Sequence, residues 1–479
     1  MQNEDVKTEN FLYLSVANQL ETAIQSGALA PGERLMSVRK MSLHNDVSVN
    51  TILLAYQHLA DKGVIYSKPK SGYFVSEKTN QYREIPYKSK VLFSSAISAL
   101  QTLEDLNLAS RQPEYLNLGS ATLDTELAPI NQIKQSFTHV VSGAADRAFT
   151  YGPAQGEPFL LSTLAQHYKQ YGLFVEESDI VVFNGATDAI CSCIEACTLP
   201  GEAIGVLTPC YNGLLQAVIS TGRKIIELPM SGRRLCLDAL EISAAAHQIR
   251  CLLITSNFQN PSGICLSNAD KLRILEIAKR HSVKIIEDDT FGEISFMDVR
   301  PKTIFEYDDT QSVYYVSSCS KTVSPGLRVG WAFIQDEHTR ELILIKKQAR
   351  YVAVNTIAQL SLAHFISNGY LNTHLKRLNK VLQSNMQRFE SQLASGLKTK
   401  IKISNPKGGL SLWISLQRKQ SSSEVFRQCL DQRIITTPGN LFSPSSTFDN
   451  SFRICFANKW QSPRMERALD TLIRIVNEI

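Results

Sequence analysis

Lys321 is the residue of this sequence best placed to do chemistry. It lies in the segment SCSKTVSPGLRVG (318–330), directly after the apolar run VYYV. A lysine at the end of a strand can form a Schiff base with an aldehyde. The hydroxyls of Ser318 and Ser320 and the guanidinium of Arg328 are groups that hold a phosphate monoester. The segment therefore predicts a site for a phosphorylated aldehyde.

This segment resembles the lysine segment of fold-type I aminotransferases, which bind pyridoxal 5'-phosphate (PLP). The resemblance implies that Lys321 carries PLP. The segment NGAT (184–187) matches the same family, since it ends the strand-like run DIVVF and opens a helix. Helix N-termini bind phosphate through free backbone N–H groups. We therefore expect Ala186 and Thr187 to form part of the phosphate cradle.

The resemblance continues in IIEDDTF (285–291), at the end of another strand-like run. A carboxylate that faces the pyridine nitrogen keeps it protonated and makes the ring an electron sink. The family places an aromatic residue three positions after this aspartate, and Phe291 then points back to Asp288. Asp289 remains the alternative.

Four further residues match the family in order along the chain. Tyr211 in PCYNGLLQAV corresponds to the aromatic that stacks on the pyridine ring, and Asn260 in QNPSG to the asparagine that binds the 3'-oxygen. Tyr151 in YGPAQGEP resembles the tyrosine that reaches the partner subunit's phosphate in a dimer. Arg453 in FRICFAN resembles the arginine that binds a substrate carboxylate.

Phe291 departs from the family, which usually has tyrosine at this position. That tyrosine donates a hydrogen bond to the 3'-oxygen of the cofactor. Without it the negative charge on this oxygen is less stabilised, and an aldimine holds its proton more tightly. We expect cofactor binding to survive and efficient transamination to be impaired.

The elements that position these residues alternate along the chain. From Leu116 onward, strand-like apolar runs (IVVF, AIGVL, KIIEL, CLLIT, KIIED, VYYV) alternate with helical stretches. This alternation is typical of an α/β protein with a largely parallel central sheet. Together with the resemblance, it predicts a PLP-dependent transferase fold of type I with a smaller C-terminal subdomain.

The N-terminal part has a different pattern. Residues 12–25 place apolar side chains on one helical face, and shorter helices are expected from Val38 to His44 and from Ser48 to about Lys62. Two short strand-like runs joined by a turn follow. Three helices and a small hairpin predict an α+β winged helix-turn-helix.

The string from Pro31 to Val75 resembles the DNA-binding domain of the GntR family. In such domains the start of the third helix presents short polar side chains to DNA. The residues expected to contact DNA are Arg39, Ser48, Asn50, Thr51, Lys68 and Lys70. The family usually has arginine where this chain has Val49, which removes one phosphate or guanine contact.

Composition and charge agree with a DNA-binding protein without a membrane span. The net charge is +5, and the interval from Arg34 to Lys70 holds six basic residues against two acidic ones. Phosphates need such a local basic face. The chain has no long apolar run and no apolar signal segment at its start, so we expect a cytoplasmic protein. Its ten cysteines are expected to be buried thiols, and no metal site is expected.

A winged helix followed by an aminotransferase-like domain is the arrangement of the MocR subfamily of GntR regulators. The expected domains are residues 1–78 for DNA binding, 79–115 as linker and 116–479 for PLP and effector binding. The resemblance implies a domain-swapped, head-to-tail homodimer. Our hypothesis is that PLP or an amine or amino-acid effector is sensed through aldimine formation, with Arg453 holding the carboxylate.

Three alternatives stay open at this stage. The chain could be a working aminotransferase with an appended head, which Lys321, Asp288 and Arg453 would permit. It could be a structural repressor that no longer binds PLP. The head could also be a helical dimerisation module without a DNA partner.

Overall fold

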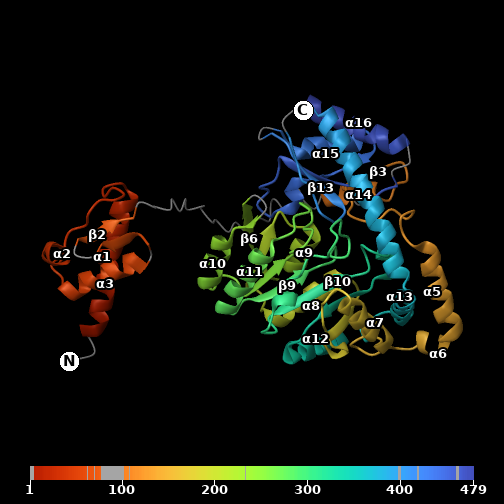
Figure 1. Ribbon diagram of the computed structural model, residues 1–479, viewed down its shortest axis with the longest axis horizontal. Helices are drawn as coiled ribbons and strands as arrows, with labels where there is room; N and C mark the ends of the chain where they lie inside the picture. Colours follow the sequence, from red (N-terminus) through yellow and green to blue (C-terminus); the bar gives the residue numbers. More distant parts are fainter. Residues whose placement is uncertain are drawn as a thin grey trace. The chain divides into compact units, whose positions relative to one another are not determined.

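The computed structural model describes residues 5–61, 63–68, 71–76, 102–106, 108–231, 234–397, 401–417, 420–459 and 463–479. By its internal contacts the chain divides into two compact units, residues 1–90 and 91–479. Figure 1 labels their helices and strands.

Among its described residues, the first unit has three helices and a two-stranded antiparallel sheet, as predicted. Its elements are α1 (Asp5–Gln25), α2 (Val38–Asn45), α3 (Val49–Asp61), β1 (Ile65–Lys68) and β2 (Gly72–Val75). Ser37 caps α2, where its side chain accepts a hydrogen bond from the backbone N–H of Lys40. Val16, Leu20, Ile52 and Tyr56 lie at helical spacing and form a buried core.

Within the described residues, the second unit has an eight-stranded sheet with the order β4-β11-β10-β9-β8-β5-β6-β7. Its strands are β4 (Ile180–Phe183), β5 (Ala203–Thr208), β6 (Lys224–Ser231), β7 (Arg234–Leu235), β8 (Cys251–Ile254), β9 (Lys284–Asp288), β10 (Val313–Ser318) and β11 (Gly330–Phe333). β11 is antiparallel to both of its neighbours, so β4 runs parallel to β10. β10, β9, β8, β5 and β6 are parallel throughout.

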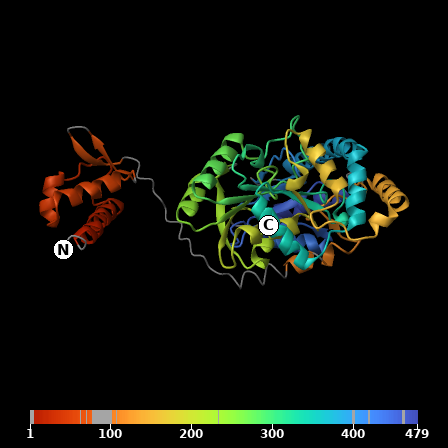
Figure 2. The same cartoon turned by 90° about the horizontal axis from the view of Figure 1, so that it is seen from below.

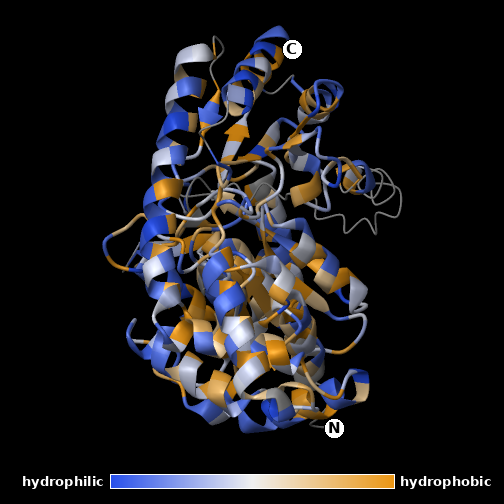
Figure 3. Ribbon diagram, turned by 90° about the vertical axis from the view of Figure 1, so that its right-hand side faces the viewer, coloured by the Kyte–Doolittle hydropathy of each residue, from blue (hydrophilic) through white to orange (hydrophobic). Residues whose placement is uncertain are grey.

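Helices cover both faces of this sheet (Figures 1 and 2). They are α5 (Ile130–Gly143), α6 (Ala145–Ala148), α7 (Pro158–Lys169), α8 (Ala186–Cys197), α9 (Asn212–Ser220), α10 (Leu237–Ala245), α11 (Asn268–Arg280), α12 (Glu337–Arg350) and α13 (Thr356–Ser367). The central strands bury nearly every residue, which explains their continuous apolar runs. Figure 3 shows hydrophobic residues gathered in these strands, while the helices carry both colours.

The long helix α14 (Tyr370–Gly396) leads from α13 to a smaller C-terminal subdomain (Figure 1). This subdomain has a second, antiparallel sheet with the order β12-β13-β16-β15, and β14 pairs with β3. Its elements are β3 (Leu116–Asn117), β12 (Lys402–Ile403), β13 (Ser411–Ser415), α15 (Ser422–Asp431), β14 (Ile434–Ile435), β15 (Thr437–Pro438), β16 (Ser451–Cys455) and α16 (Pro463–Glu478). Short 3-10 turns complete the chain. The type I transferase fold was therefore predicted correctly.

The end of the range expected to be a linker is part of the large domain. Residues 102–106 are helical, and Leu106, Ala109 and Tyr115 pack in an apolar cluster with Trp413 and Phe442. The earlier part of that range, 79–101, lies outside the described residues.

Gly330 holds the start of β11 against the N-terminus of α8. A Cβ at this position would lie 2.5 Å from the carbonyl carbon of Gly185 and 2.6 Å from the nitrogen of Ala186. Both are backbone atoms, which cannot move without shifting the helix. Only glycine therefore permits this approach.

We predict that Gly330→Ala lowers the free energy of unfolding of the large domain by about 3 kcal/mol, because overpacking forces backbone shifts. Gly143→Ala is the control, since its Cβ would meet nothing within 4 Å. The three tryptophans all follow residue 330, so their fluorescence during urea unfolding reports this domain. Equal stability of the two variants would contradict the packing argument.

Candidate PLP and effector site

The candidate site lies where parallel strands end. β4, β5, β8, β9 and β10 run in one direction, and ligands of α/β sheets bind beyond the carboxyl ends of such strands. Asp288 and Ser318 are the last residues of β9 and β10. Tyr211 follows β5, and Thr187 follows β4. The sheet thus collects residues that are far apart in sequence.

The lysine amine is held next to the smaller subdomain. Lys321 Nζ donates a hydrogen bond of 2.8 Å to the carbonyl oxygen of Ala121. Burial, followed by the positive charge of Arg453, lowers the pKa of Lys321 to about 8. Asp288 acts on this pKa in the opposite direction. A large fraction of the amine is therefore neutral, and so nucleophilic, at mildly alkaline pH.

Three consecutive carboxylates at the end of β9 have different surroundings. Glu287 accepts hydrogen bonds of 2.9 Å from the backbone N–H groups of Ile304 and Phe305, and burial raises its pKa to about 7. Asp288 is 7% exposed and accepts hydrogen bonds from the backbone N–H and hydroxyl of Thr290. Burial raises the pKa of Asp288.

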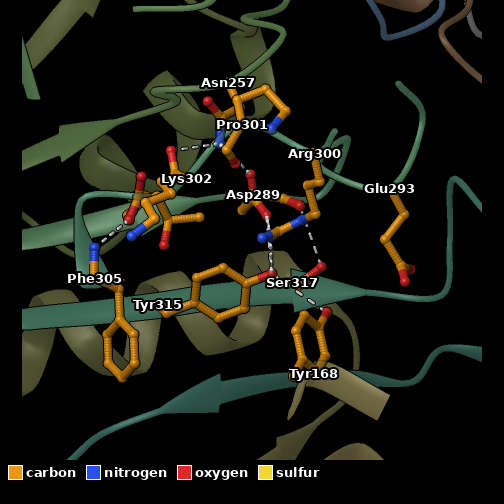
Figure 4. Close-up of polar contacts among 12 residues, drawn as sticks. Tyr168, Asn257, Asp289, Glu293, Arg300, Pro301, Lys302, Phe305, Tyr315 and Ser317 are labelled. Carbon is orange, nitrogen blue, oxygen red and sulfur yellow. Dashed lines mark hydrogen bonds and ion pairs between the residues drawn. The ribbon is translucent and has the colours of Figure 1, made fainter. Parts of the chain in front are cut away.

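Asp289 belongs to a separate polar network (Figure 4). Its carboxylate pairs with Arg300 and accepts hydrogen bonds from the Tyr315 hydroxyl at 3.0 Å and the Asn257 amide at 3.3 Å. All four side chains are largely buried. The negative charge of Asp289 is therefore already balanced by Arg300, whereas the charge of Asp288 acts on Lys321. This difference favours Asp288 over Asp289 as the carboxylate that serves a ligand.

The start of α8, which Gly185 precedes, is shaped as an anion cradle. Gly185 has a φ of +94°, and a Cβ there would lie 2.5 Å from Arg328 Nη2. The same Nη2 donates a hydrogen bond of 2.9 Å to the carbonyl oxygen of Asn184. Ala186 and Thr187 begin the helix, with Thr187 exposed. Backbone N–H groups and a guanidinium therefore converge at one point, as a phosphate requires.

Ser318 and Ser320 lie in the loop that also bears Lys321. Both serines are buried, and the backbone N–H of Ser320 lies 3.4 Å from the Ser318 hydroxyl. Ser318 is the register partner of Gly330, which packs against the start of α8. The structure thus places Ser318 on the strand that adjoins the cradle.

Arg453 is a buried cation without a carboxylate partner. It is 5% exposed, and its guanidinium donates to the carbonyl oxygen of Gly119, to Asn260 Oδ1 at 2.9 Å and to the Thr437 hydroxyl at 3.3 Å. Its guanidinium carbon lies 5.1 Å from the centre of the Phe442 ring. Among the described residues no carboxylate lies within 4 Å of it. An unpaired buried charge costs several kcal/mol, so this arrangement suits an anionic ligand.

A cavity of about 480 Å³ lies at Arg453, and Lys321, Asp288 and Arg328 are not among its lining residues. Thr187, Tyr211 and Arg453, all predicted as site residues, line it. Asn260 joins the wall indirectly, through its hydrogen bond to Arg453. Tyr151 lies apart and is 85% exposed.

Other lining residues were missed from the sequence. They are Leu103, Leu106, Ser110, Gly119, Ser120, Asn212, Gly213, Gln216, Ala217, Ser220, Thr437, Leu441 and Phe442. The spacing of Leu103, Leu106 and Ala109 is a helical signal, which was overlooked inside the expected linker. Thr437 and Phe442 carry no motif, so only the fold could place them.

In the first unit the predicted DNA contacts separate into two groups. Arg39, Ser48, Asn50 and Lys68 are exposed. Thr51 is only 2% exposed, and its hydroxyl hydrogen-bonds to the Ser48 hydroxyl at 2.7 Å. The prediction for Thr51 is thus corrected, because its side chain packs inside the head and cannot reach DNA.

Ser48 also has a structural role, since its hydroxyl accepts a hydrogen bond of 3.0 Å from the backbone N–H of Thr51. The Lys68 ammonium lies over the rings of Tyr66 and Phe74, at 5.5 and 4.9 Å from their centres. Lys70 lies outside the described residues. Val49, 52% exposed, replaces a cation at the start of α3.

Comparison with known proteins agrees with this geometry. Residues 113–472 match the family of class I and II aminotransferases, and residues 12–75 match the bacterial regulatory proteins of the gntR family. The chain therefore belongs to the class I and II aminotransferase family, whose cofactor is PLP, and carries a GntR-type DNA-binding domain. This combination is that of MocR-type transcription regulators.

The full-length relatives are regulators. The HTH-type transcriptional regulator YjiR of Escherichia coli is 29% identical over 92% of this chain and 94% of its own. NorG of Staphylococcus aureus is 25% identical over 88% of this chain and 95% of its own. In the crystal structure of kynurenine aminotransferase from Pyrococcus horikoshii, 94% of that chain matches 79% of this one, with 22% identity and a TM-score of 0.73. The last likeness establishes the fold of the large domain.

Among the described residues, no helix is long and apolar enough to span a membrane.

We predict that the rate at which Lys321 reacts with added PLP rises with pH and levels off above about 8, because only the neutral amine is nucleophilic. Arg453→Met removes a positive charge that lowers this pKa, so the midpoint should move to higher pH. Stopped-flow absorbance of the cofactor-free protein measures both profiles. Identical midpoints would contradict the electrostatic coupling.

We also predict that Val49→Arg strengthens DNA binding and steepens the salt dependence, log Kd against log salt, by about 0.9, as one more phosphate contact requires. Leu12→Arg, which adds the same charge on α1, should change the slope far less. Fluorescence anisotropy with duplex DNA from 50 to 200 mM salt gives the slope. If both variants behave alike, Val49 does not face the DNA.

Proposed function

We propose that this protein is a cytoplasmic transcription regulator whose DNA binding responds to PLP itself or to an amine or amino-acid effector at the Lys321 site. The observation that carries the proposal is the pairing of a buried, carboxylate-free Arg453 with a lysine of lowered pKa near one cavity. This pairing provides a cation for a carboxylate and a nucleophilic amine for an aldehyde. A purely structural domain has no need of either.

The residues present fit PLP. The cradle at Gly185, the Arg328 guanidinium and the Ser318 and Ser320 hydroxyls suit its phosphate, and Asp288 suits its pyridine nitrogen. When bound, the cofactor supplies an aldehyde carbon to which either the lysine or an effector amine can be joined. The role of Tyr211 is to cover the ring, and that of Asn260 to hold its 3'-oxygen.

Within this proposal each protein group has a separate task. Lys321 Nζ, which donates a hydrogen bond to the Ala121 carbonyl, would be the amine that holds the cofactor. Arg453 binds the effector carboxylate in exchange for its weaker contacts with neutral acceptors, and charge-assisted hydrogen bonds are the stronger ones. Arg453 stands on β16 of the smaller subdomain, whereas Asp288 stands on the large sheet. A ligand held by both therefore draws the two subdomains together.

A homodimer is part of the proposal. Tyr151 is 85% exposed and Phe149 66%, so two aromatic rings of one loop face away from their own subunit. Exposed aromatics of this kind are typical of interfaces. We infer a head-to-tail, domain-swapped dimer in which Tyr151 reaches the partner subunit's phosphate. Two heads would then bind paired half-sites on DNA, with Arg39, Ser48, Asn50, Lys68 and Lys70 as contacts.

A working aminotransferase is the second candidate, because Lys321, Asp288 and Arg453 meet its minimal needs. Phe291 disfavours it: the ring is 5% exposed, packs in an apolar cluster and has no polar atom to offer the cofactor. Half-transamination of the PLP-loaded protein by a panel of amino acids distinguishes the candidates, since full conversion within minutes would favour the enzyme.

We predict that borohydride reduction of the PLP-loaded protein fixes the cofactor on Lys321. Lys347 is the internal control, since burial also lowers its pKa to about 8, yet it lies under Phe183 and Tyr351 and bonds the Ala154 carbonyl. Peptide mass mapping identifies the modified lysine. Label on Lys347 would refute the site assignment.

The functional readout is anisotropy with the DNA upstream of the protein's own gene, at defined salt, with and without PLP. Specific binding by the natural protein should change with PLP, and Lys321→Ala should bind DNA without that response. Binding that shows no preference over random DNA in either state would contradict the proposed regulation at this promoter.

A further inference from the structure

One wall of the cavity comes from the segment 102–110. Leu103, Leu106 and Ser110 of this segment line the same cavity as Thr187 and Arg453. Most of the segment is helical. The segment does not belong to the eight-stranded sheet, whose strand ends carry the lysine and the aspartate. A ligand in the cavity would therefore contact this segment as well as residues next to the sheet.

The segment is packed on the smaller subdomain through few side chains. Leu106 is 9% exposed and Ala109 is 6% exposed, and both belong to the apolar cluster that includes Phe442. The Phe442 ring also lies beneath the Arg453 guanidinium, 5.1 Å from ring centre to guanidinium carbon. The Ser110 hydroxyl accepts a hydrogen bond of 3.0 Å from Asn117. A continuous set of contacts thus joins the segment to Arg453.

The segment is also the first described part of the chain after the DNA-binding head, which ends with β2 at Val75. A ligand that orders residues 102–110 therefore restrains the point at which the connection to that head enters the large domain. This is a consequence of chain connectivity and needs no contact between the two units.

The residues that line the cavity restrict the kind of side chain that a ligand can carry. Arg453 is the one charged residue among the described residues that line the cavity. A side chain with its own charge would find no counter-charge there and would lose its hydration. Leu103, Leu106, Leu441 and Phe442 instead offer apolar surface. These residues suit an aliphatic or aromatic side chain.

We propose that the effector is an amino acid with an apolar side chain, which contacts Leu103 and Leu106 while Arg453 holds its carboxylate, and that this contact couples the cavity to the connection with the DNA-binding head. The proposal rests on the proposed function, since it assigns the effector of the same site. Leu103 is then a specificity-determining residue and the point at which occupancy is transmitted to residues 102–110.

The experiment compares Leu103→Ala with Leu108→Ala in the full-length, PLP-loaded protein. Leu108 is the matched control, since it lies in the same segment, is 57% exposed and does not line the cavity. Leucine, phenylalanine, aspartate and lysine are titrated against the absorbance of the lysine-bound cofactor. Leucine and phenylalanine should bind more tightly than the charged amino acids. Leu103→Ala should weaken leucine binding about tenfold, as loss of one apolar contact predicts, and Leu108→Ala should leave it unchanged.

Two further measurements test the coupling. Hydrogen exchange of the backbone amides in 102–110 should slow when leucine saturates the natural protein, and less so in Leu103→Ala. At saturating leucine, the change in DNA affinity should be smaller in Leu103→Ala than in Leu108→Ala. Equal changes in both variants, with no added protection of 102–110, would overturn the coupling.

Tighter binding of aspartate or lysine than of leucine, or equal leucine affinity in the two variants, would overturn the assignment of the effector. Failure of the proposed function is separate from these outcomes. It would appear beforehand, as a natural protein that forms no lysine-bound cofactor absorbance with PLP at all.

Discussion

Most of the candidate ligand groups depend on a single constraint, the common direction of β4, β5, β8, β9 and β10, whereas Arg453 comes from β16 of the smaller subdomain. Parallel strands place their carboxyl ends at one edge, so residues more than a hundred positions apart meet there without any local signal. The approach of Gly330 to the start of α8 fixes the height of the phosphate cradle relative to the lysine loop. A shift of either element would break the hydrogen bond from Arg328 to the Asn184 carbonyl oxygen, just before this helix N-terminus.

The charged groups at this edge of the sheet differ in whether other protein groups already serve as their partners. Glu287 satisfies the backbone of the following segment, and Asp289 with Arg300 forms a closed network with Tyr315 and Asn257 (Figure 4). Asp288 and Arg453 are left facing the lysine, with opposite effects on its pKa. Under the proposed function the site would take a carboxylate at Arg453, and this buried cation would gain most from its arrival.

Under the proposed function, the same arrangement would let an enzyme fold serve as a sensor. Arg453, proposed to bind the effector carboxylate, and Asp288, proposed to face the pyridine nitrogen, belong to two subdomains. A ligand that engages both residues would therefore change the spacing of the subdomains. Under the same proposal, Phe291, whose side chain has no polar atom, would leave the cofactor's 3'-oxygen without a tyrosine donor and so favour binding over turnover. The wall formed by residues 102–110 is the first described part of the chain after the DNA-binding head.

The sequence by itself determined both domain types, because each depends on a local string: the lysine segment 318–330 and the winged-helix string from Pro31 to Val75. It also identified Lys321, Asp288 and Arg453 as candidates. Three features were decided only by tertiary structure. Thr51 is buried, since the third helix packs that face into the head. Asp289 is paired with Arg300, which is eleven residues further along the chain. The wall at Leu103 depends on packing against Phe442, some 340 residues later. Burial, pairing and shared cavities are relations between distant residues, which only the folded chain brings into contact.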